Sequence, residues 1–314
     1  MCLPIQKTIC SKLATLASLQ RPQNSFHQYL WKGQTRSLSL LGLKDSHISQ
    51  DPLSPRSSEA KKTTAADINE RGTAIIEELR SAVNIHFPLH PFTHKVSAGN
   101  SEEVMGKYMA MSQAFPFIQA GAYKDLVLRA IHRSQPISEE VEKTFVIGTF
   151  LCWDETGSQY LLQQEGMSAL PKILDTKTQF HANLLRKDLQ IIFNHTVEPN
   201  YCSDTQTYLL QLMKKLGASN KLERSAMMVA FEMHAERMIQ ELWKSLADSH
   251  SLQKENLIYF EAHVGGDDPA EAYHVALTQK LVQDLVSPKE KEEFFRFFME
   301  SYALNVSWCE TICK

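Results

Sequence analysis

The sequence is poor in glycine and has no long apolar run. Glycine supplies only 12 of the 314 residues, against an average of about 7%, which argues against an all-β fold and against glycine-looped nucleotide-binding designs. No run approaches the ~18 consecutive apolar residues of a membrane span. The longest apolar stretch, residues 144–153, is short and is followed by Asp154. We therefore expect a globular protein without a membrane span, in which residues 144–153 form a buried helix.

An excess of charge of either sign is also absent. The 33 basic and 36 acidic residues give a net charge of −3, which excludes the positive electrostatic footprint of a nucleic-acid-binding protein. The six cysteines are scattered without metal-type spacing, apart from Cys309 and Cys313 near the carboxyl terminus. This usage favours a reducing compartment. The sequence thus predicts no nucleic-acid partner and a cytoplasmic location.

The first 44 residues contain no Asp or Glu, although they include six Lys and Arg residues among Ser, Thr, Gln and Leu. This composition is typical of an organelle transit peptide, and the alternative is a disordered tail without an address. A polar linker with two prolines follows at residues 51–64. We therefore predict a disordered or targeting segment over residues 1–64 and one folded domain over residues 65–314. If residues 1–44 are a transit peptide, an organelle such as the mitochondrion replaces the cytoplasm.

Apolar residues at helical spacing recur from residue 65 to the carboxyl terminus, whereas period-two alternation is absent. The pattern predicts an all-α domain, a bundle of about seven or eight helices. The predicted helices cover residues 65–83, 101–133 with a break at Pro116, 138–162, 170–194, 205–216, 221–246, 255–286 and 289–308.

One predicted helix carries an unusual group of polar residues. His263, Asp267 and His274 are four and then seven residues apart, which on a helix places them within about 40° of one face. The glycines at 265–266 and Pro269 weaken a helix there, as is typical of a segment held by ligands. Two imidazoles and a carboxylate would then converge on one metal-ligating face. Histidines at the surface, or satisfied in the core, are the alternative.

Carboxylates in the other predicted helices fit the same picture. Glu232 and Glu236 share one face of the helix over residues 221–246, and carboxylates are rarely buried without a counter-charge or a metal. A position at the solvated edge is the alternative. Glu155 follows the long apolar run, and His181 has apolar neighbours. Oxygen and nitrogen ligands of this kind suit a pair of irons or manganeses in a helical bundle better than zinc, and such sites activate dioxygen.

The order of these residues resembles that of the non-heme diiron oxidases and oxygenases of the heme-oxygenase-like superfamily. The similarity covers roughly residues 87–308 and implies a heme-oxygenase-like helical bundle. It also implies two bound iron ions, or one manganese and one iron, and a homodimer, since the family often dimerises. The metal ligands that the resemblance implies are Glu155, His181, Glu236, His263, Asp267 and His274.

The sequence departs from the family pattern in three places. His274 stands seven residues after Asp267, where the family usually has three or four, and Ala270 occupies the usual position. The interval between the first carboxylate and the first histidine is longer than in small members. Glu232 competes with Glu236, which we prefer because its sequence neighbourhood is more similar to the family's. An incomplete site would preserve the fold and remove the oxidase function.

The sequence therefore predicts a non-heme diiron, dioxygen-dependent oxidoreductase that oxidises or cleaves a C–H, C–C or C–N bond of a small organic substrate. No side-chain nucleophile is expected beyond the metal site. The alternative is a metal-free helical module of the same superfamily that binds a small molecule or a partner protein. Heme binding is disfavoured because His90 and His94 precede the first core helix. A cysteine-based hydrolase is disfavoured because Cys152 and Cys202 have no partner at a motif spacing.

Overall fold

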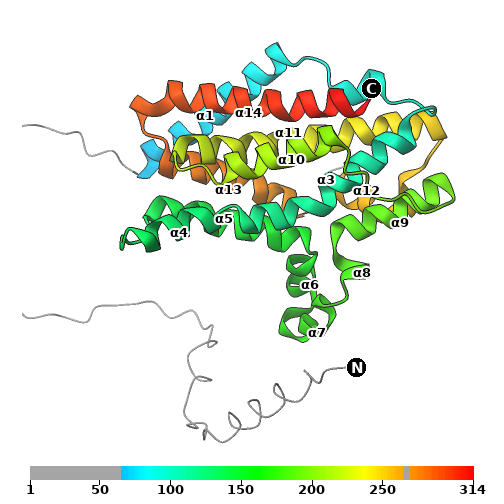
Figure 1. Cartoon of the computed structure of the whole chain (residues 1–314), viewed down its shortest axis with the longest axis horizontal. Helices are drawn as coiled ribbons and strands as arrows, with labels where there is room; N and C mark the ends of the chain where they lie inside the picture. The colour runs from blue at the N-terminus through cyan, green and yellow to red at the C-terminus, as the bar shows by residue number, and fades with distance from the viewer. Residues whose placement is uncertain (1–64, 265–268) are drawn as a thin grey trace, which may run out of the picture. The chain divides into compact units, whose positions relative to one another are not determined.

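The computed structural model describes residues 65–264 and 269–314, and no strand occurs among them (Figure 1). The predicted all-α fold is confirmed. The predictions for residues 1–64 and for Asp267 lie outside the described residues. The longer helices are α1 (Ala65–His86), α3 (Ser101–Gly121), α4 (Lys124–His132), α5 (Glu139–Glu155), α6 (Ser158–Glu165), α9 (His181–Phe193), α10 (Ser203–Leu216), α11 (Lys221–His250), α13 (Pro269–Leu285) and α14 (Lys291–Ile312). Shorter pieces are α2 (Pro91–Lys95), α7 (Leu170–Ile173), α8 (Thr176–Gln179) and α12 (Ile258–His263), with 3-10 turns η1 (Gly166–Ala169), η2 (Lys254–Asn256) and η3 (Pro288–Glu290).

The long helix α11 lies in the middle of the bundle and contacts α14, α13, α10, α5 and α2 (Figure 1). It begins at Asn220, whose side chain accepts a hydrogen bond from the Leu222 N–H at 2.8 Å and so caps the helix. Its apolar residues are buried against α14, where Leu242, Leu246 and Phe298 are fully enclosed. Each such side chain stabilises the fold by about 1.5–3 kcal/mol relative to an exposed one. α11 therefore offers side chains to every neighbouring helix, on more than one face.

Two predicted helix ends lie elsewhere in the structure. The break predicted at Pro116 is wrong, because α3 continues through it to Gly121, with most of the helix buried. The helix predicted over residues 138–162 ends at Glu155 instead. Gly157 follows with a φ of +69°, and a Cβ atom there would lie 2.3 Å from the Gln179 carbonyl oxygen. Only glycine fits this left-handed position against α8, so the chain turns directly after Glu155.

Two further predicted helices are divided. Residues 170–194 form α7, α8 and α9, and the described residues of 255–286 form η2, α12 and α13. α12 ends at His263, where Val264 follows with an extended backbone, and the described part of α13 runs from Pro269 to Leu285. The prediction that His263 and His274 share one face of a single helix is therefore wrong, because the two histidines lie on different helices.

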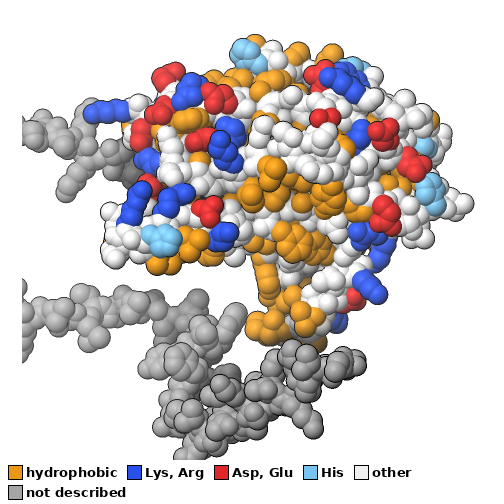
Figure 2. All heavy atoms as spheres, viewed as in Figure 1, with side chains coloured by type: hydrophobic (Ala, Val, Ile, Leu, Met, Phe, Trp, Pro, Cys, Tyr) orange, Lys and Arg blue, Asp and Glu red, His pale blue; other side chains and the backbone are white. Residues whose placement is uncertain are grey.

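Hydrophobic side chains gather in the middle of the face shown in Figure 2 and continue over the α6–α7 segment that projects from the other helices. Exposed apolar residues on α10 include Leu210 and Met213. In the projecting segment, Met167 of η1, Leu170 of α7 and Leu174, which follows α7, are exposed. Among the described helices, none combines the length and the apolar character needed to cross a bilayer.

Candidate metal centre

His274 lies between two carboxylates that come from two other helices. α13 packs against α5 and α11, and this packing places the imidazole between Asp154 and Glu232. Nε2 is 3.1 Å from Asp154 Oδ2, and Nδ1 is 3.3 Å from Glu232 Oε2. The three side chains are largely withdrawn from solvent, with exposed fractions of 19%, 6% and 12%. The interior of the bundle thus holds two acids facing one imidazole.

The two acids decide the charge of this imidazole. Burial by itself disfavours the charged ring, but hydrogen bonding to Asp154 and Glu232 and their negative charges outweigh it and raise the pKa of His274 to about 11. The ring is therefore an imidazolium at neutral pH. It supplies the counter-charge that a pair of poorly solvated carboxylates requires.

A second group surrounds Glu155, the next residue of α5, on which the charge of Asp154 acts. His181 Nδ1 lies 3.6 Å from Glu155 Oε2. The His181 and His263 rings meet edge to face, with centroids 4.8 Å apart. Burial favours protonation of Glu155, but hydrogen bonding and charge from His181, with the charge of His263, hold the pKa of Glu155 below its usual value. Glu155 is thus an ionised carboxylate facing two imidazoles.

The orientation of His263 is fixed by its own helix. Its Nδ1 lies 2.7 Å from the Tyr259 carbonyl oxygen, which can only accept a hydrogen bond. Nδ1 therefore carries the proton, and in the neutral ring the lone pair is on Nε2. Metal-ligating histidines are commonly held by this type of bond to a backbone carbonyl.

The short helix α12 is itself held in place by α9. Asp188 Oδ2 accepts hydrogen bonds from the backbone N–H groups of Tyr259 at 2.8 Å and of Phe260 at 3.2 Å, and thereby caps α12. Asp188 is seven residues after His181, so one helix supplies a histidine and fixes the helix that carries His263. Burial, only partly offset by these bonds, raises the pKa of Asp188 to about 6.

The 25 residues between Glu155 and His181 form a separate segment of short helices. α6, η1, α7 and α8 lead away from the end of α5 and return at the start of α9. The close approach of Gly157 to the Gln179 backbone brings the two ends of this segment together.

A pair of buried tyrosines lies near Glu155, whose charge acts on both. Their hydroxyl oxygens, in Tyr108 and Tyr259, are 2.9 Å apart.

The structure brings four of the predicted ligands into this centre, namely Glu155, His181, His263 and His274. Glu236 is one turn beyond Glu232 on α11, about 6 Å further along the axis, and its side chain is exposed. The geometry therefore favours Glu232 over Glu236. Asp267 falls outside the described residues. Sequence reasoning missed Asp154, although its place beside Glu155 at the end of the apolar run was a usable signal.

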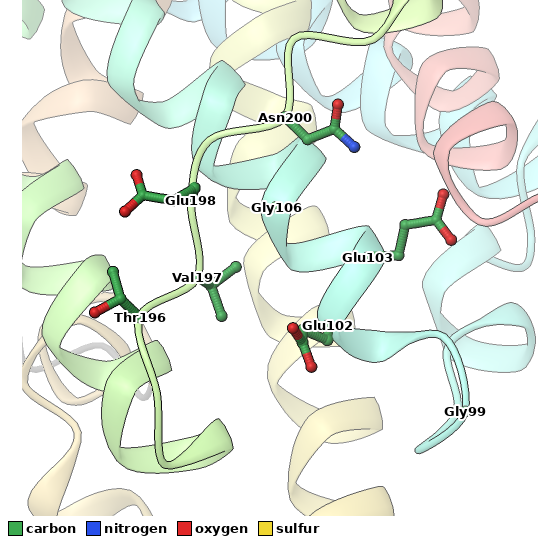
Figure 3. Close-up of a pocket in the computed structure, with 8 residues that line it drawn as sticks. All are labelled: Gly99, Glu102, Glu103, Gly106, Thr196, Val197, Glu198 and Asn200. Carbon is green, nitrogen blue, oxygen red and sulfur yellow. The ribbon is translucent and has the colours of Figure 1, made fainter.

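A hollow of about 490 Å³ opens at the surface elsewhere, between the start of α3 and the loop that follows α9 (Figure 3). Its three glutamates point in different directions in Figure 3, and Glu102 pairs with exposed His195 at 2.8 Å. None of the predicted ligands lines it, and we assign it no function. Its lining residues are Gly99, Glu102, Glu103, Gly106, Thr196, Val197, Glu198 and Asn200.

Comparison with known proteins identifies a fold and no family. No known protein family matches the sequence, and no curated protein matches it. A crystal structure from Nostoc punctiforme, described as a CADD-like protein of unknown function, is similar with a TM-score of 0.56. The two sequences are 15% identical, and the similarity covers 78% of this chain and 97% of the other. The chain thus has the helical fold of this CADD-like protein.

Proposed function

We propose that the chain is a metal-dependent oxidoreductase that holds two iron ions and uses dioxygen to oxidise or cleave a bond of a small organic substrate. The observation that carries this proposal is the pair of adjacent carboxylate–imidazole groups inside the helical bundle. Oxygen and nitrogen ligands from facing helices are the donor set of two-metal carboxylate centres. Manganese in place of one iron fits the same ligands.

Each group would hold one metal ion after its side chains draw together, because among the described residues only His90, His234 and Cys309 already bring three ligand atoms within 4.8 Å of one another. Glu155, His181 and His263 would hold the first ion, and Asp154, Glu232 and His274 would hold the second. Both groups take a carboxylate from the end of α5, where Asp154 and Glu155 are consecutive. Asp267 stays a predicted ligand.

The charges present fit a cation. Asp154, Glu155 and Glu232 bring three carboxylates into a region with little solvent, and the proton on His274 offsets only part of their charge. A metal cation at His274 would replace this proton, since a ligating imidazole must be neutral. Bound iron would supply the activation of dioxygen.

The surrounding side chains orient the ligands and exclude water. The Nδ1–H bond to the Tyr259 carbonyl presents Nε2 of His263, and the Tyr259 ring stacks on His263 at 4.2 Å. On the other side, the ring of Phe150 meets His274 edge to face, with centroids 6.4 Å apart. Aromatic faces of this kind limit access of bulk water to the ligands.

The test is iron binding by the full chain after anaerobic reconstitution, followed by an absorption spectrum and dioxygen consumption on exposure to air. Glu232→Ala and Glu236→Ala form a matched pair on one face of α11. We expect the parent and Glu236→Ala to bind two irons, and Glu232→Ala to lose iron and dioxygen consumption while circular dichroism stays helical. His263→Ala should behave as Glu232→Ala does.

A metal-free binding module is the second candidate, because the protonated His274 already neutralises part of the charge of Asp154 and Glu232 without a metal. If the Glu232→Ala and His263→Ala variants bind as much iron as the parent, the diiron proposal is wrong and this module takes its place.

A further inference from the structure

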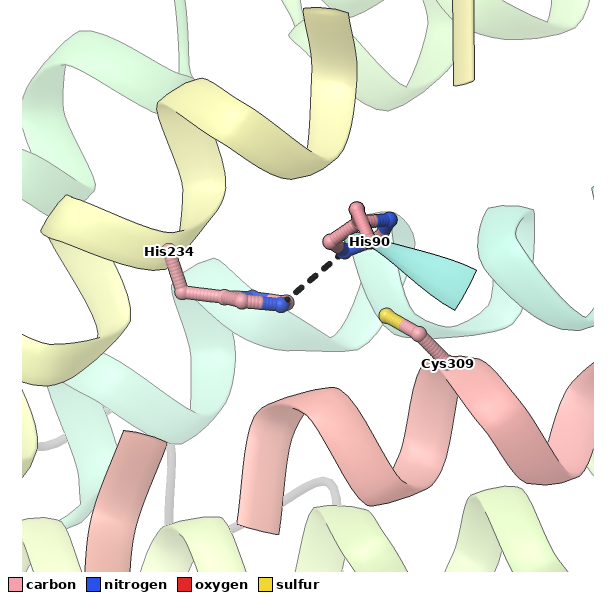
Figure 4. A group of neighbouring side chains, drawn as sticks. All are labelled: His90, His234 and Cys309. Atoms are coloured by element: carbon pink, nitrogen blue, oxygen red, sulfur yellow. Dashed lines mark hydrogen bonds between the residues drawn. The ribbon is translucent and has the colours of Figure 1, made fainter. Parts of the chain in front are cut away.

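Another cluster of ligand atoms lies in the core, between the segment before α2 and the helices α11 and α14 (Figure 4). The Nε2 atoms of His90 and His234 are 3.2 Å apart. One nitrogen of each ring and the Cys309 sulfur all lie within 4.8 Å of one another. The exposed fractions of the three residues are 2%, 1% and 0%. Figure 4 shows the three side chains pointing toward one another from three separate segments.

We propose that His90, His234 and Cys309 bind a single Cu(I) ion. This site is separate from the centre described above, and the proposal does not depend on the proposed function. Soft thiolate ligands select Cu(I) as well as zinc, and imidazole suits both metals. Three ligands suffice for Cu(I), whereas structural zinc sites almost always have four. Among the described residues the cluster offers three.

The charges around the cluster favour a monovalent ion. Cu(I) with one thiolate and two neutral imidazoles is electrically neutral, which suits a site without solvent. A divalent ion would leave one positive charge there, in a region where the charge of Arg237 outweighs that of Glu241. Burial is the main reason for the low pKa of His90, about 4, and of His234, and the charge of Arg237 lowers both further. Both rings are thus neutral, as ligands must be.

Binding requires two proton movements. Without metal, His90 Nδ1 accepts a hydrogen bond from the Phe92 N–H at 3.2 Å, so Nε2 carries the ring proton and donates it toward His234. For Nε2 to bind Cu(I), this proton must move to Nδ1, and the capping bond to Phe92 is lost. Burial raises the pKa of the Cys309 thiol, so the thiol keeps its proton until the copper–sulfur bond replaces the S–H bond, and the proton then leaves for solvent through the opened segment before α2. Two hydrogen bonds, the capping bond to Phe92 and the bond between His90 and His234, are thus exchanged for three metal–ligand bonds.

Access to the site is provided by the segment that precedes α2. Leu89, next to His90, is exposed. Arg237 holds the segment in place, because its guanidinium donates hydrogen bonds to the Phe87 and Pro88 carbonyl oxygens at 2.6 and 2.8 Å. Opening of this one non-helical connection exposes His90 without moving α11 or α14.

The experiment uses the full chain with the five other cysteines, Cys2, Cys10, Cys152, Cys202 and Cys313, changed to Ser. This background protein is titrated anaerobically with Cu(I) in competition with bicinchoninate. We expect one Cu(I) per chain. Adding Cys309→Ala, or His234→Leu, should weaken binding by more than the roughly 10- to 100-fold that changes outside the ligand shell cause. X-ray absorption of the background protein should show one sulfur and two nitrogen ligands, a result that does not rely on any core variant folding.

Equal Cu(I) affinity with and without Cys309 would overturn the proposal, as would a copper absorption spectrum without sulfur. Tighter binding of Zn(II) than of Cu(I) by the background protein would overturn the choice of a monovalent ion. Circular dichroism of each variant establishes that it is folded before its affinity is compared.

Discussion

The two histidine clusters share α11 but give their imidazoles opposite character. His274 faces Asp154 and Glu232, and these acids raise its pKa to about 11. His90 and His234 face each other and a cysteine, and burial lowers the pKa of His90 to about 4. The pKa of a histidine in this bundle is therefore set by whether a carboxylate accompanies it into the interior, since burial lowers it in both places.

One helix can supply both clusters because neighbouring positions face different directions. Glu232 and His234 are two residues apart on α11, which turns them about 200° from each other. Glu232 faces α13 and α5, and His234 faces α14 and the segment before α2. A helix in the middle of a bundle thus separates the site of Glu232 and His274 from a cluster in which burial and the charge of Arg237 outweigh the one carboxylate, Glu241, that acts on His90.

The largest effect is expected where a charge is left without its partner. His274→Ala leaves Asp154 and Glu232 facing each other and should lower the free energy of unfolding by about 3 kcal/mol at pH 6. His234→Ala removes a neutral ring and should cost about 2 kcal/mol, from lost packing and one hydrogen bond. Urea unfolding of the metal-free proteins measures both. A smaller loss of stability for His274→Ala than for His234→Ala would contradict the conclusion that His274 is the charged partner of two buried acids.

The same two variants should differ in the sign of their pH dependence. The folded-state pKa of His274 lies above the value of about 6.5 for unfolded histidine, so its stabilisation is complete below pH 6.5 and is lost as the pH rises toward 11. The folded-state pKa of His234 lies below that value, so its stabilisation is present above pH 6.5 and is lost as the pH falls. Unfolding at pH 5.5, 7 and 9 tests the two trends. Parallel trends would contradict the assigned charges.

A third effect is expected at the turn that brings His181 to Glu155. Gly157→Ala should cost more than the roughly 1–2 kcal/mol of a left-handed backbone, because its Cβ would collide with the Gln179 backbone. Gly166→Ala is the control, since Gly166 also has a positive φ but nothing lies within 4 Å of its Cβ. Thermal unfolding measures the cost, and iron stoichiometry should fall only for Gly157→Ala. Equal iron loss in both variants would show that the Gly157 turn does not position the metal ligands.

Asp188 tests how α12 is held. Asp188→Ala removes the acceptor for two backbone N–H groups and should cost about 2 kcal/mol, whereas Asp188→Asn keeps an acceptor oxygen and should cost less. Hydrogen exchange of Tyr259 and Phe260 amides should rise in the Ala variant.

The charge of Asp188 adds a pH dependence. Its folded-state pKa of about 6 exceeds the unfolded value near 3.9, so its stabilising contribution is complete below about pH 4 and is lost as the pH rises through 6. The parent should therefore lose stability relative to Asp188→Asn between pH 4 and 7. A constant difference between the two proteins would exclude a raised pKa.

The smallest effect is expected at Glu236, where the side chain is exposed. Glu236→Ala should change the free energy of unfolding by no more than about 0.5 kcal/mol, the usual range for surface substitutions. Chemical denaturation at pH 7 measures it against Glu232→Ala. A large loss at Glu236 would show that this acid, and not only Glu232, has a partner in the interior.

Local sequence patterns were sufficient for the helical class. Apolar spacing identified α1, α10, α11 and α14 nearly to their ends, because each buries a continuous stripe against neighbours. Breaks were less predictable. Pro116 interrupts no helix, since tertiary burial of α3 outweighs its local cost, and Gly157 ends one because of an atom of α8 that is distant in sequence.

The sequence predicted which kinds of residue could bind a metal, but it predicted only some of the residues that the fold brings together. The sequence by itself determined a helical bundle with Glu155, His181, His263 and His274 as polar residues near apolar runs. The tertiary structure decided that Asp154 and Glu232 face His274, and that His90 and His234 meet Cys309. Spacing along one helix gives only the angle between residues of that helix. Which of two carboxylates a turn apart reaches an imidazole on another helix depends on the level along the axes at which the helices pack.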